Sequence, residues 1–280
     1  MLDRNSLDEA AASLAVDERI RLRTFVGEAD FFRGVLEPDL ASLPPCDPIV
    51  EVGSGIGLLA MTLSSAGRQV IAFEPQSAGF GQMRMMRDLI LRHWDGPPPR
   101  VEWVDDYLGT DDVRATQHDP SYVYAINVIE HVPDVARFIA DAMSILRPGG
   151  RFRFVCPNYA IPYEPHFEIP TLFTKRATYR ILRKRILRAP MPDPQGMWDE
   201  LSWPTVGSLR AILDGMDVHY EFSSAATASY LSRPLHDESF IQRKGRAVGG
   251  ALSLAARTTP PLIGYLPVSL LPIIDCSIWA

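Results

Sequence analysis

The sequence is short of cysteine and of positive charge, and each shortage excludes a class of protein. Its three cysteines, Cys46, Cys156 and Cys276, lie far apart and lack the paired spacing of a disulfide framework or a zinc site. The formal net charge of −6 argues against a protein that coats nucleic acid, so we expect no nucleic-acid partner. A chain of 280 residues with 46% hydrophobic residues can bury one large core, and we expect a single domain.

Long uninterrupted apolar runs are also missing. The stretch MLDRNSLDEA carries charges where a signal peptide needs its apolar segment, which predicts a cytoplasmic protein. The apolar segment 260–280 is too short, and too broken by Pro267 and Pro272, to span a bilayer. Its simplest role is to supply a strand, although a role next to a membrane stays open.

What the sequence does contain is an alternation of strand patterns and helical patterns. The expected strands cover 48–52, 69–75, 101–106, 121–127, 151–158 and 217–225. The expected helices cover 7–36 as one or two segments, 58–67, 77–94, 135–150 and 205–216. Such alternation predicts an α/β fold with a mostly parallel sheet covered on both faces. We divide the chain into an N-terminal helical cap, 1–45, and a domain, 46–280, with an insertion at about 159–204.

The stretch EVGSGIGLLA, residues 51–60, places three glycines directly after the first expected strand. A glycine-rich turn lets the backbone approach a ligand closely, and the following helix offers free N–H groups and a positive dipole end. The dinucleotide fingerprint needs its third glycine, or an alanine, three residues after the second, where this chain has Leu58. The GxGxG spacing therefore disfavours an NAD-dependent oxidoreductase.

Further motifs follow the later strands in order. Glu74 ends the second strand about twenty residues downstream, where a carboxylate can accept two hydrogen bonds from a ribose diol. Asp105 and Asp106 follow the third strand, NVIEHV follows the fourth, and LRPGGRF leads into the fifth. Together with ExGxGxG, this order resembles the class I S-adenosylmethionine-dependent methyltransferases over about residues 46–160. Within that class, the chain resembles the broad group that contains the ubiquinone-pathway O-methyltransferases.

The resemblance implies a Rossmann-like, doubly wound, mostly parallel seven-stranded sheet with an antiparallel last strand. DCSIWA, 275–280, resembles that last strand, paired with 217–225. The implied cofactor is S-adenosyl-L-methionine, and Glu51 would orient the glycine loop or reach the cofactor's amino group through a water. Four loop residues would pass close to its methionine part and its ribose: Gly53, Ser54, Gly55 and Gly57.

The resemblance also assigns roles to polar residues after the later strands. Glu74 would hold the ribose hydroxyls, and Asp105 or Asp106 would face the adenine amino group. Asn127, after the fourth strand, would lie under the sulfonium end. The chain departs from many relatives at Ser121, because they open the fourth strand with Asp, and we assign that position no role.

Methyl transfer is an in-line displacement, so the protein aligns the acceptor and, if the acceptor is a hydroxyl, removes its proton. His131, in NVIEHVPD, and His166, in the loop PNYAIPYEPHFEIP, both follow strands, and imidazole titrates near neutral pH. His166 lies among aromatic residues and is our first choice as the base, with His131 second. The alternative for His131 is a capping or backbone contact before the helix that follows Pro133.

Glu130, His131 and the distant His166 also resemble a metal-supported arrangement, ExxEH plus His. That arrangement occurs in some 2′-O-methyltransferases that act on RNA ends and in certain quinone-pathway relatives. Here Asn127 replaces the first carboxylate, so the three residues form an incomplete ligand set. A divalent metal is therefore left open and is not assigned.

The segment 172–190 is basic in a chain that is acidic overall. Tyr179, Leu182 and Ile186 recur at helical spacing, which predicts a basic amphipathic helix that contacts an anionic membrane or grips a phosphorylated substrate. The alternative is a solvated lid helix over the pocket. The segment holds seven cationic residues and no acidic one: Lys175, Arg176, Arg180, Arg183, Lys184, Arg185 and Arg188.

These observations predict an S-adenosylmethionine-dependent methyltransferase whose insertion forms the acceptor pocket. We expect O-methylation of a small molecule, with a sugar hydroxyl of a glycan or lipid-linked acceptor ahead of a phenolic or quinone-like ring. The loop YEPHFEIP resembles that of bacterial methyltransferases associated with surface polysaccharide. A quinone or phenolic O-methyltransferase and a non-catalytic cofactor-binding protein remain as alternatives, and the oligomeric state is left open. RNA methylation is disfavoured because the sequence has no recognised RNA-binding module.

Overall fold

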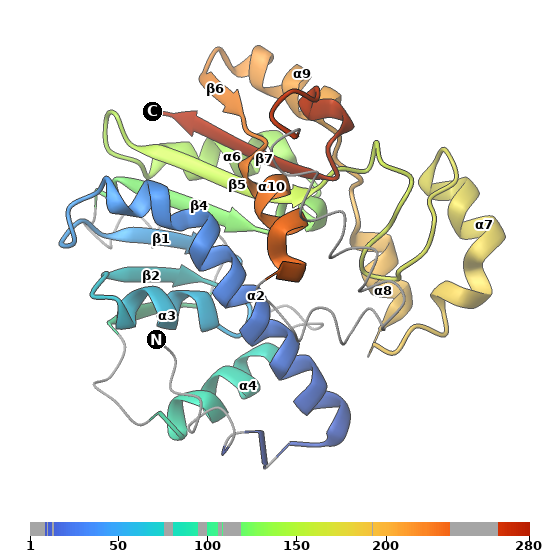
Figure 1. Cartoon of the computed structure of the whole chain (residues 1–280), viewed down its shortest axis with the longest axis horizontal. Helices are drawn as coiled ribbons and strands as arrows, with labels where there is room; N and C mark the ends of the chain where they lie inside the picture. Colours follow the sequence, from blue (N-terminus) through green and yellow to red (C-terminus); the bar gives the residue numbers. More distant parts are fainter. Residues whose placement is uncertain are drawn as a thin grey trace.

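The computed structural model describes residues 9, 11–12, 14–75, 81–94, 100–105, 108, 119–191, 193–235 and 263–280 (Figure 1). Its strands are β1 (Ile49–Val52), β2 (Val70–Phe73), β3 (Val101–Val104), β4 (Tyr122–Ile126), β5 (Arg151–Pro157), β6 (His219–Phe222) and β7 (Ile273–Trp279). Its helices are α2 (Val16–Ala41), α3 (Leu58–Ser65), α4 (Gly81–Arg92), α6 (Val135–Ser144), α7 (Lys175–Ile186), α8 (Pro194–Glu200), α9 (Val206–Met216) and α10 (Ala225–Ser232). Short 3-10 turns are η1 (Ile129–His131), η2 (Arg233–Leu235) and η3 (Val268–Leu270).

The seven strands of the described residues form one sheet in the order β3-β2-β1-β4-β5-β7-β6. Neighbouring pairs from β3 to β5 are parallel, whereas β7 is antiparallel to both β5 and β6. The pairing of β7 with β6 confirms the antiparallel last strand and its predicted partner. The expected α/β fold with a doubly wound, mostly parallel sheet is therefore confirmed.

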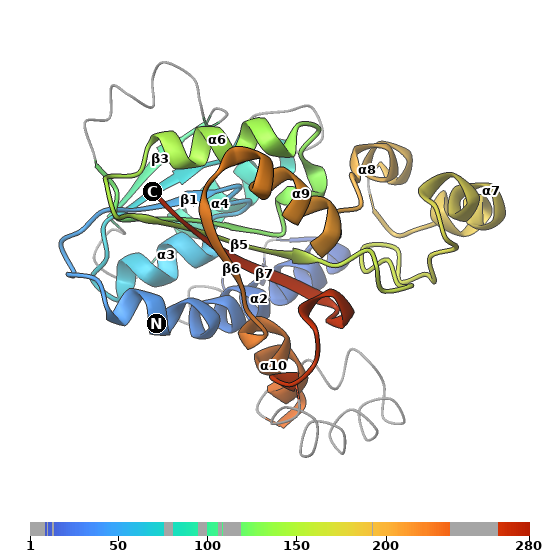
Figure 2. The same cartoon turned by 90° about the horizontal axis from the view of Figure 1, so that it is seen from above.

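The sheet buries both faces, because alternate side chains along each strand enter two separate cores. Ile49 of β1 packs with apolar residues of α2, α3, α4 and α10, whereas its neighbour Val50 packs with those of α6 and α9. Figure 2 shows α2, α3 and α10 on one side of the sheet and α6 and α9 on the other. This two-sided burial explains why the strands read as continuous apolar runs in the sequence.

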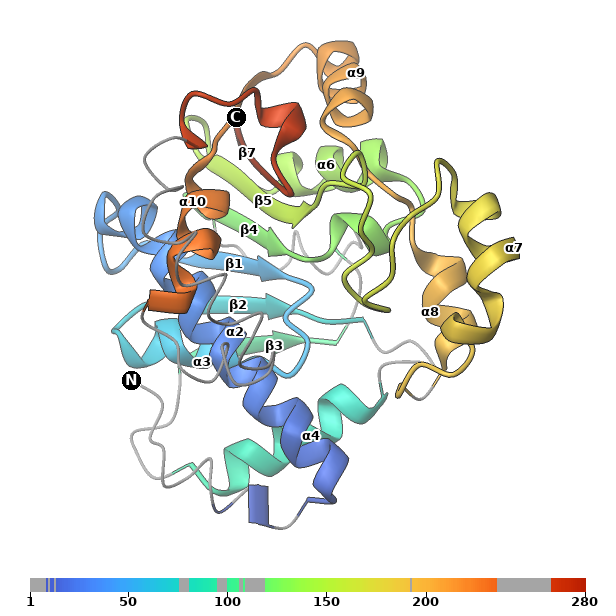
Figure 3. The same ribbon diagram turned by 45° about the vertical axis from the view of Figure 1, so that its right-hand side comes forward.

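A third, smaller core forms within the segment between β5 and α9. It contains Phe167, Ile169, Ile186, Trp198 and Leu201, which join α7, α8 and the loop before them. Figure 3 shows α7 and α8 beyond the arrowheads of the parallel strands. This segment therefore faces the sheet edge at which α/β folds bind their ligands.

A buried ion-pair network ties α2 to the sheet. Arg153 of β5 donates to both carboxylate oxygens of Asp275 in β7, at 2.9 and 2.8 Å, and to Asp39 of α2 at 2.7 Å. Asp39 also accepts from the Tyr122 hydroxyl at 2.7 Å and pairs with Arg151 at 2.6 Å. Burial alone would raise the pKa of Asp39, but the two arginines and Tyr122 hold it below its ordinary value.

The structure differs from the sequence expectations at several helices. The helix expected over 135–150 ends at Ser144, and helix α8 within the insertion was not expected. Helix α2 continues past residue 36 to Ala41 and includes Pro38, because the contacts of the adjacent Asp39 hold the last turn against the sheet. Helix α10 was not expected and begins directly after β6. Among the described helices, none combines the length and the apolar character needed to cross a membrane.

Candidate functional site

The glycine turn joins β1 to α3 and is held against the neighbouring strand β2. The Gly53 and Ser54 N–H groups both donate to the Phe73 carbonyl, at 2.8 and 2.9 Å. Gly53, Gly55 and Gly57 have φ values of 74°, 55° and 75°, which favour glycine. A Cβ atom on Gly53 would lie 2.4 Å from Val128 Cγ2, whereas one on Gly55 would have no described neighbour within 4 Å. The turn thus packs closely on its protein side and stays open at Gly55.

Glu74, directly after β2, is fixed at this turn. Its Oε2 atom accepts a hydrogen bond of 2.7 Å from the Gly55 N–H. Burial raises the pKa of Glu74, while the Gly55 N–H and the Arg87 guanidinium act in the opposite direction. The Glu74 carboxylate therefore lies beside Gly55, where the turn is open. Its Oε1 atom does not take part in the hydrogen bond with Gly55.

Glu51 lies beneath the same turn, within β1. The side chain is buried, and its Oε2 atom has no hydrogen-bond partner among the described residues. Burial raises the pKa of Glu51 to about 8, Glu74 adds to this rise, and Tyr124 and the Ala60 N–H oppose it. A buried carboxyl oxygen without a partner can accept a hydrogen bond from a cationic ligand group.

The remaining predicted cofactor residues occupy the ends of β3 and β4. Asp105 pairs with Arg84 at 3.2 Å and with Arg87 at 3.0 Å, both on α4, and Asp106 lies outside the described residues. Asn127 is exposed, has a φ of 55°, and donates its N–H to the Val155 carbonyl at 2.8 Å. Their adenine and sulfonium roles stay predictions, while Ser121 is buried at the start of β4.

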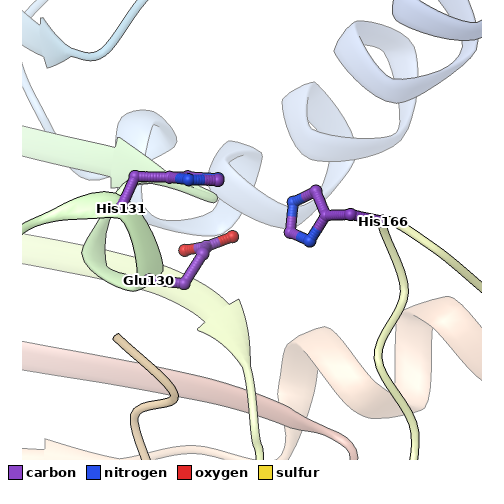
Figure 4. A group of neighbouring side chains, drawn as sticks. All are labelled: Glu130, His131 and His166. Carbon is purple, nitrogen blue, oxygen red and sulfur yellow. The ribbon is translucent and has the colours of Figure 1, made fainter. Parts of the chain in front are cut away.

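The predicted catalytic residues come together from two adjacent strands (Figure 4). Glu130 and His131 lie in η1 after β4, and His166 lies on the loop after β5. One potential ligand atom from each lies within 4.8 Å of the others, and the two imidazole centroids are 5.1 Å apart. Because β4 and β5 are parallel neighbours, their carboxyl ends bring these residues together despite their separation in sequence.

Glu164 holds His166 in place and was missed by the sequence reasoning. This fully buried carboxylate contacts His166 Nδ1 at 2.7 Å and accepts hydrogen bonds from the Tyr159 hydroxyl at 3.1 Å and the Phe167 N–H at 2.7 Å. Burial alone would lower the pKa of His166, but the Glu164 carboxylate raises it. Nδ1 therefore carries the proton, which leaves Nε2 for the cluster. The spacing of Glu and His within YEPHFEIP was the available signal.

Glu130 and His131 lack the partners that buried polar groups ordinarily have. Both carboxylate oxygens of Glu130, and Nδ1 of His131, form no hydrogen bond with the described residues. Burial raises the pKa of Glu130 to about 7, while burial and the charge of His166 lower that of His131 to about 4. The capping alternative for His131 fails, because Asp134 caps α6 by accepting from the Arg137 N–H at 2.9 Å.

These three residues fit one divalent cation. Two imidazoles and one carboxylate are a common ligand set, and such a set leaves coordination positions open for other ligands. Glu164 would act as the carboxylate that orients a metal-bound histidine. The orphaned oxygens of Glu130 support this fit independently of any sequence motif.

Comparisons with known proteins give the family. A family model described as a methyltransferase domain matches residues 29–217. The uncharacterized protein Rv1509 of Mycobacterium tuberculosis is 36% identical over 253 residues, which cover 89% of this chain and 84% of that protein. The ubiquinone biosynthesis O-methyltransferase of Rhodopseudomonas palustris is 29% identical over 106 residues, which cover 36% of each chain.

A solved structure supports the fold alone. The cyclopropane-fatty-acyl-phospholipid synthase-like protein of Lactobacillus casei superposes with a TM-score of 0.54 at 11% identity, covering 99% of this chain and 100% of that protein. The family match spans more than half of the chain, from within α2 to the end of α9. With the glycine turn and its acidic partner at the predicted sheet edge, the chain belongs to the methyltransferase-domain family as a class I S-adenosylmethionine-dependent methyltransferase.

Proposed function

We propose that the chain transfers a methyl group to a hydroxyl oxygen of a small molecule, and specifically to a sugar hydroxyl of a glycan or lipid-linked acceptor. The Glu164–His166 pair carries this proposal, because a hydroxyl acceptor must lose its proton during the displacement. A buried carboxylate fixes the imidazole at the sheet edge where the family binds its cofactor. The orientation of that imidazole is set before any acceptor binds.

One group of residues would bind the cofactor, and another would act on the acceptor. S-adenosylmethionine supplies an activated methyl group when it is bound. The glycine turn and Glu74 would hold it, with Glu74 accepting from the ribose hydroxyls. His166 Nε2 would take the proton of the acceptor hydroxyl as that oxygen attacks, and Glu164 would stabilise the resulting imidazolium. The insertion at 159–204 would surround the acceptor, so the domain division is part of this proposal.

The acceptor class can be tested by labelling. The purified protein would be incubated with methyl-labelled S-adenosylmethionine and separate fractions of glycolipid, soluble glycan and phenolic or quinone compounds. We expect label as an alkali-stable methyl ether in the glycolipid or glycan fraction. Label confined to the phenolic fraction would favour the quinone-type alternative, and tight cofactor binding without transfer to any fraction would favour a binding protein.

Replacing Glu74 with alanine is expected to weaken S-adenosylmethionine binding by about ten- to a hundredfold. The variant removes a charged acceptor worth about 1.5–3 kcal/mol and frees the Gly55 N–H that this carboxylate holds. Calorimetry with S-adenosylmethionine and S-adenosylhomocysteine measures the change. Glu221→Ala, at an exposed position of β6, is the matched control. Equal affinities of Glu74→Ala and the control would refute the ribose assignment.

A metal-supported reaction is the second candidate function. It is favoured by the two unpartnered oxygens of Glu130 beside His131 and His166. A bound divalent cation would supply Lewis-acid activation of the acceptor hydroxyl. In that case His166 would bind the cation through Nε2, and the chelation test described in the Discussion separates the two roles.

A further inference from the structure

The outer side of α7 combines positive charge with exposed apolar side chains. We propose that this side, called here the outer face of α7, docks on the surface of an anionic lipid bilayer. The outer face comprises Phe173, Arg176, Arg180, Ile181, Lys184 and Leu187, all of which are exposed. The inference goes beyond the proposed methyl transfer and does not depend on it.

The orientation of α7 is fixed by its opposite side. Thr178 and Ile186 are buried, and Tyr179 and Leu182 pack with the small core that includes Trp198 of α8. Lys175 reinforces this attachment by donating to the Asp199 and Leu201 carbonyls, at 2.9 and 2.6 Å. Figures 1 and 2 show α7 at the outer edge of the molecule. The outer face is therefore held rigidly and points away from the protein.

The charge of this region is concentrated and uncompensated. Residues 169–191 contain no acidic residue, although the whole chain has a formal net charge of −6. Arg176, Arg180 and Lys184 recur every fourth residue, and none forms an ion pair within the described part of the chain. A stripe of three free cations on one helix face complements a negatively charged surface.

The apolar side chains decide which anionic surface fits. Phe173 is fully exposed and has a φ of 57°, and Ile181, next to Arg180 in the helix, is 68% exposed. A fully exposed aromatic side chain leaves its apolar surface in water, and burial in an apolar environment would be favourable. A bilayer interface offers acyl chains to the apolar groups and headgroup charges to the cations. A free phosphate would satisfy only the cations. A nucleic acid could also stack a base on Phe173, but it would leave the aliphatic Ile181 and Leu187 in water.

Docking would place the candidate site next to the bilayer. The loop that carries His166 leads directly into α7 through Phe173, and Arg185 of α7 donates to the Glu168 carbonyl at 2.9 Å. The helix and the catalytic loop therefore form one connected unit. A lipid-linked acceptor could then approach the site without leaving the membrane surface.

Vesicle sedimentation tests the proposal with the full chain. The probes are vesicles of phosphatidylcholine alone and vesicles with equal parts of phosphatidylcholine and phosphatidylglycerol. We expect the protein to sediment with the anionic vesicles and not with the neutral ones, and added salt should weaken binding. The triple variant Arg176→Gln, Arg180→Gln, Lys184→Gln should bind about a hundredfold more weakly, since each cation contributes about fivefold.

Two further variants test whether binding depends on the outer face of α7 and on its apolar side chains. Arg23→Gln, Arg92→Gln, Arg210→Gln removes the same charge from exposed positions elsewhere and should bind as the wild type does. Phe173→Ser with Ile181→Ser keeps every cation and should lose at least about tenfold in vesicle affinity. Circular dichroism and S-adenosylmethionine affinity check that each variant is folded.

Several results would overturn the proposal. These are no sedimentation of the wild type with anionic vesicles, equal sedimentation with neutral ones, or an equal loss in the control triple variant. Unchanged vesicle binding by the serine variant, together with competition by soluble glycerol phosphate, would indicate a phosphate site instead of a bilayer surface. No part of the vesicle assay requires methyl transfer. Its result can therefore be interpreted even if the proposed function is wrong.

Discussion

Replacing His166 with asparagine is expected to lower kcat by roughly 10²- to 10⁴-fold, the usual contribution of a positioned general base. Asparagine can still hydrogen-bond to Glu164, so the loop should keep its shape, but it cannot accept the proton of the acceptor. S-adenosylmethionine affinity should stay unchanged, because His166 lies outside the glycine turn. A labelled-methyl assay and calorimetry together provide both readouts.

His219→Asn provides the matched control, because this exposed histidine lies on β6 and packs on Trp279, away from the cluster. Full turnover in His166→Asn would exclude His166 as the base. A parallel measurement after chelation addresses the metal. If chelation abolishes wild-type turnover and one divalent cation restores it, while His166→Asn abolishes binding of that cation, His166 acts as a ligand and the base proposal is wrong.

Replacing Arg153 with methionine is expected to lower the free energy of unfolding by about 3–5 kcal/mol. The change leaves Asp275, which is 1% exposed, without its two charged hydrogen bonds and removes one cation from Asp39. An uncompensated buried carboxylate costs far more than a broken surface pair. The shift in the urea midpoint, at an unchanged denaturant slope, measures the effect.

Arg137→Met is the comparison on the surface of α6. Its partner Asp141 lies one helical turn away at 3.2 Å, and the Arg137 side chain is 70% exposed, so we expect a loss of at most about 1 kcal/mol. If the two variants lose equal stability, the network does not anchor α2 to the sheet. The double variant Arg153→Met, Asp275→Leu should recover part of the loss, because it removes the orphaned charge.

The sheet was predictable because its strands are buried on both faces. Runs such as VIAF and YVYAI are apolar at consecutive positions and alternate with helical patterns, so their order alone indicates a parallel α/β sheet. Helix α10 was missed because AATASYLS has little amphipathic pattern. It is helical because Ala226 and Thr227 are buried against β7.

The residues of the site could be predicted only where they directly follow an expected strand. The glycine turn, Glu74 and the histidines each follow a strand, so strand order placed them at one edge of the sheet. Glu164 was not assigned because its role depends on the loop folding back, as its bridge to Ile169 shows. The arginines that hold Asp105 also lie on a different element, and local sequence carries no signal for such pairing.

The position of β7 has a consequence for synthesis on the ribosome. This strand is synthesised after both β5 and β6, yet it lies between them in the sheet. Among the described strands, β6 pairs only with β7, and Arg153 meets Asp275 only once β7 is in place. Cotranslational folding can therefore assemble β1 to β5, but the other edge of the sheet must wait until residues 273–279 have left the exit tunnel.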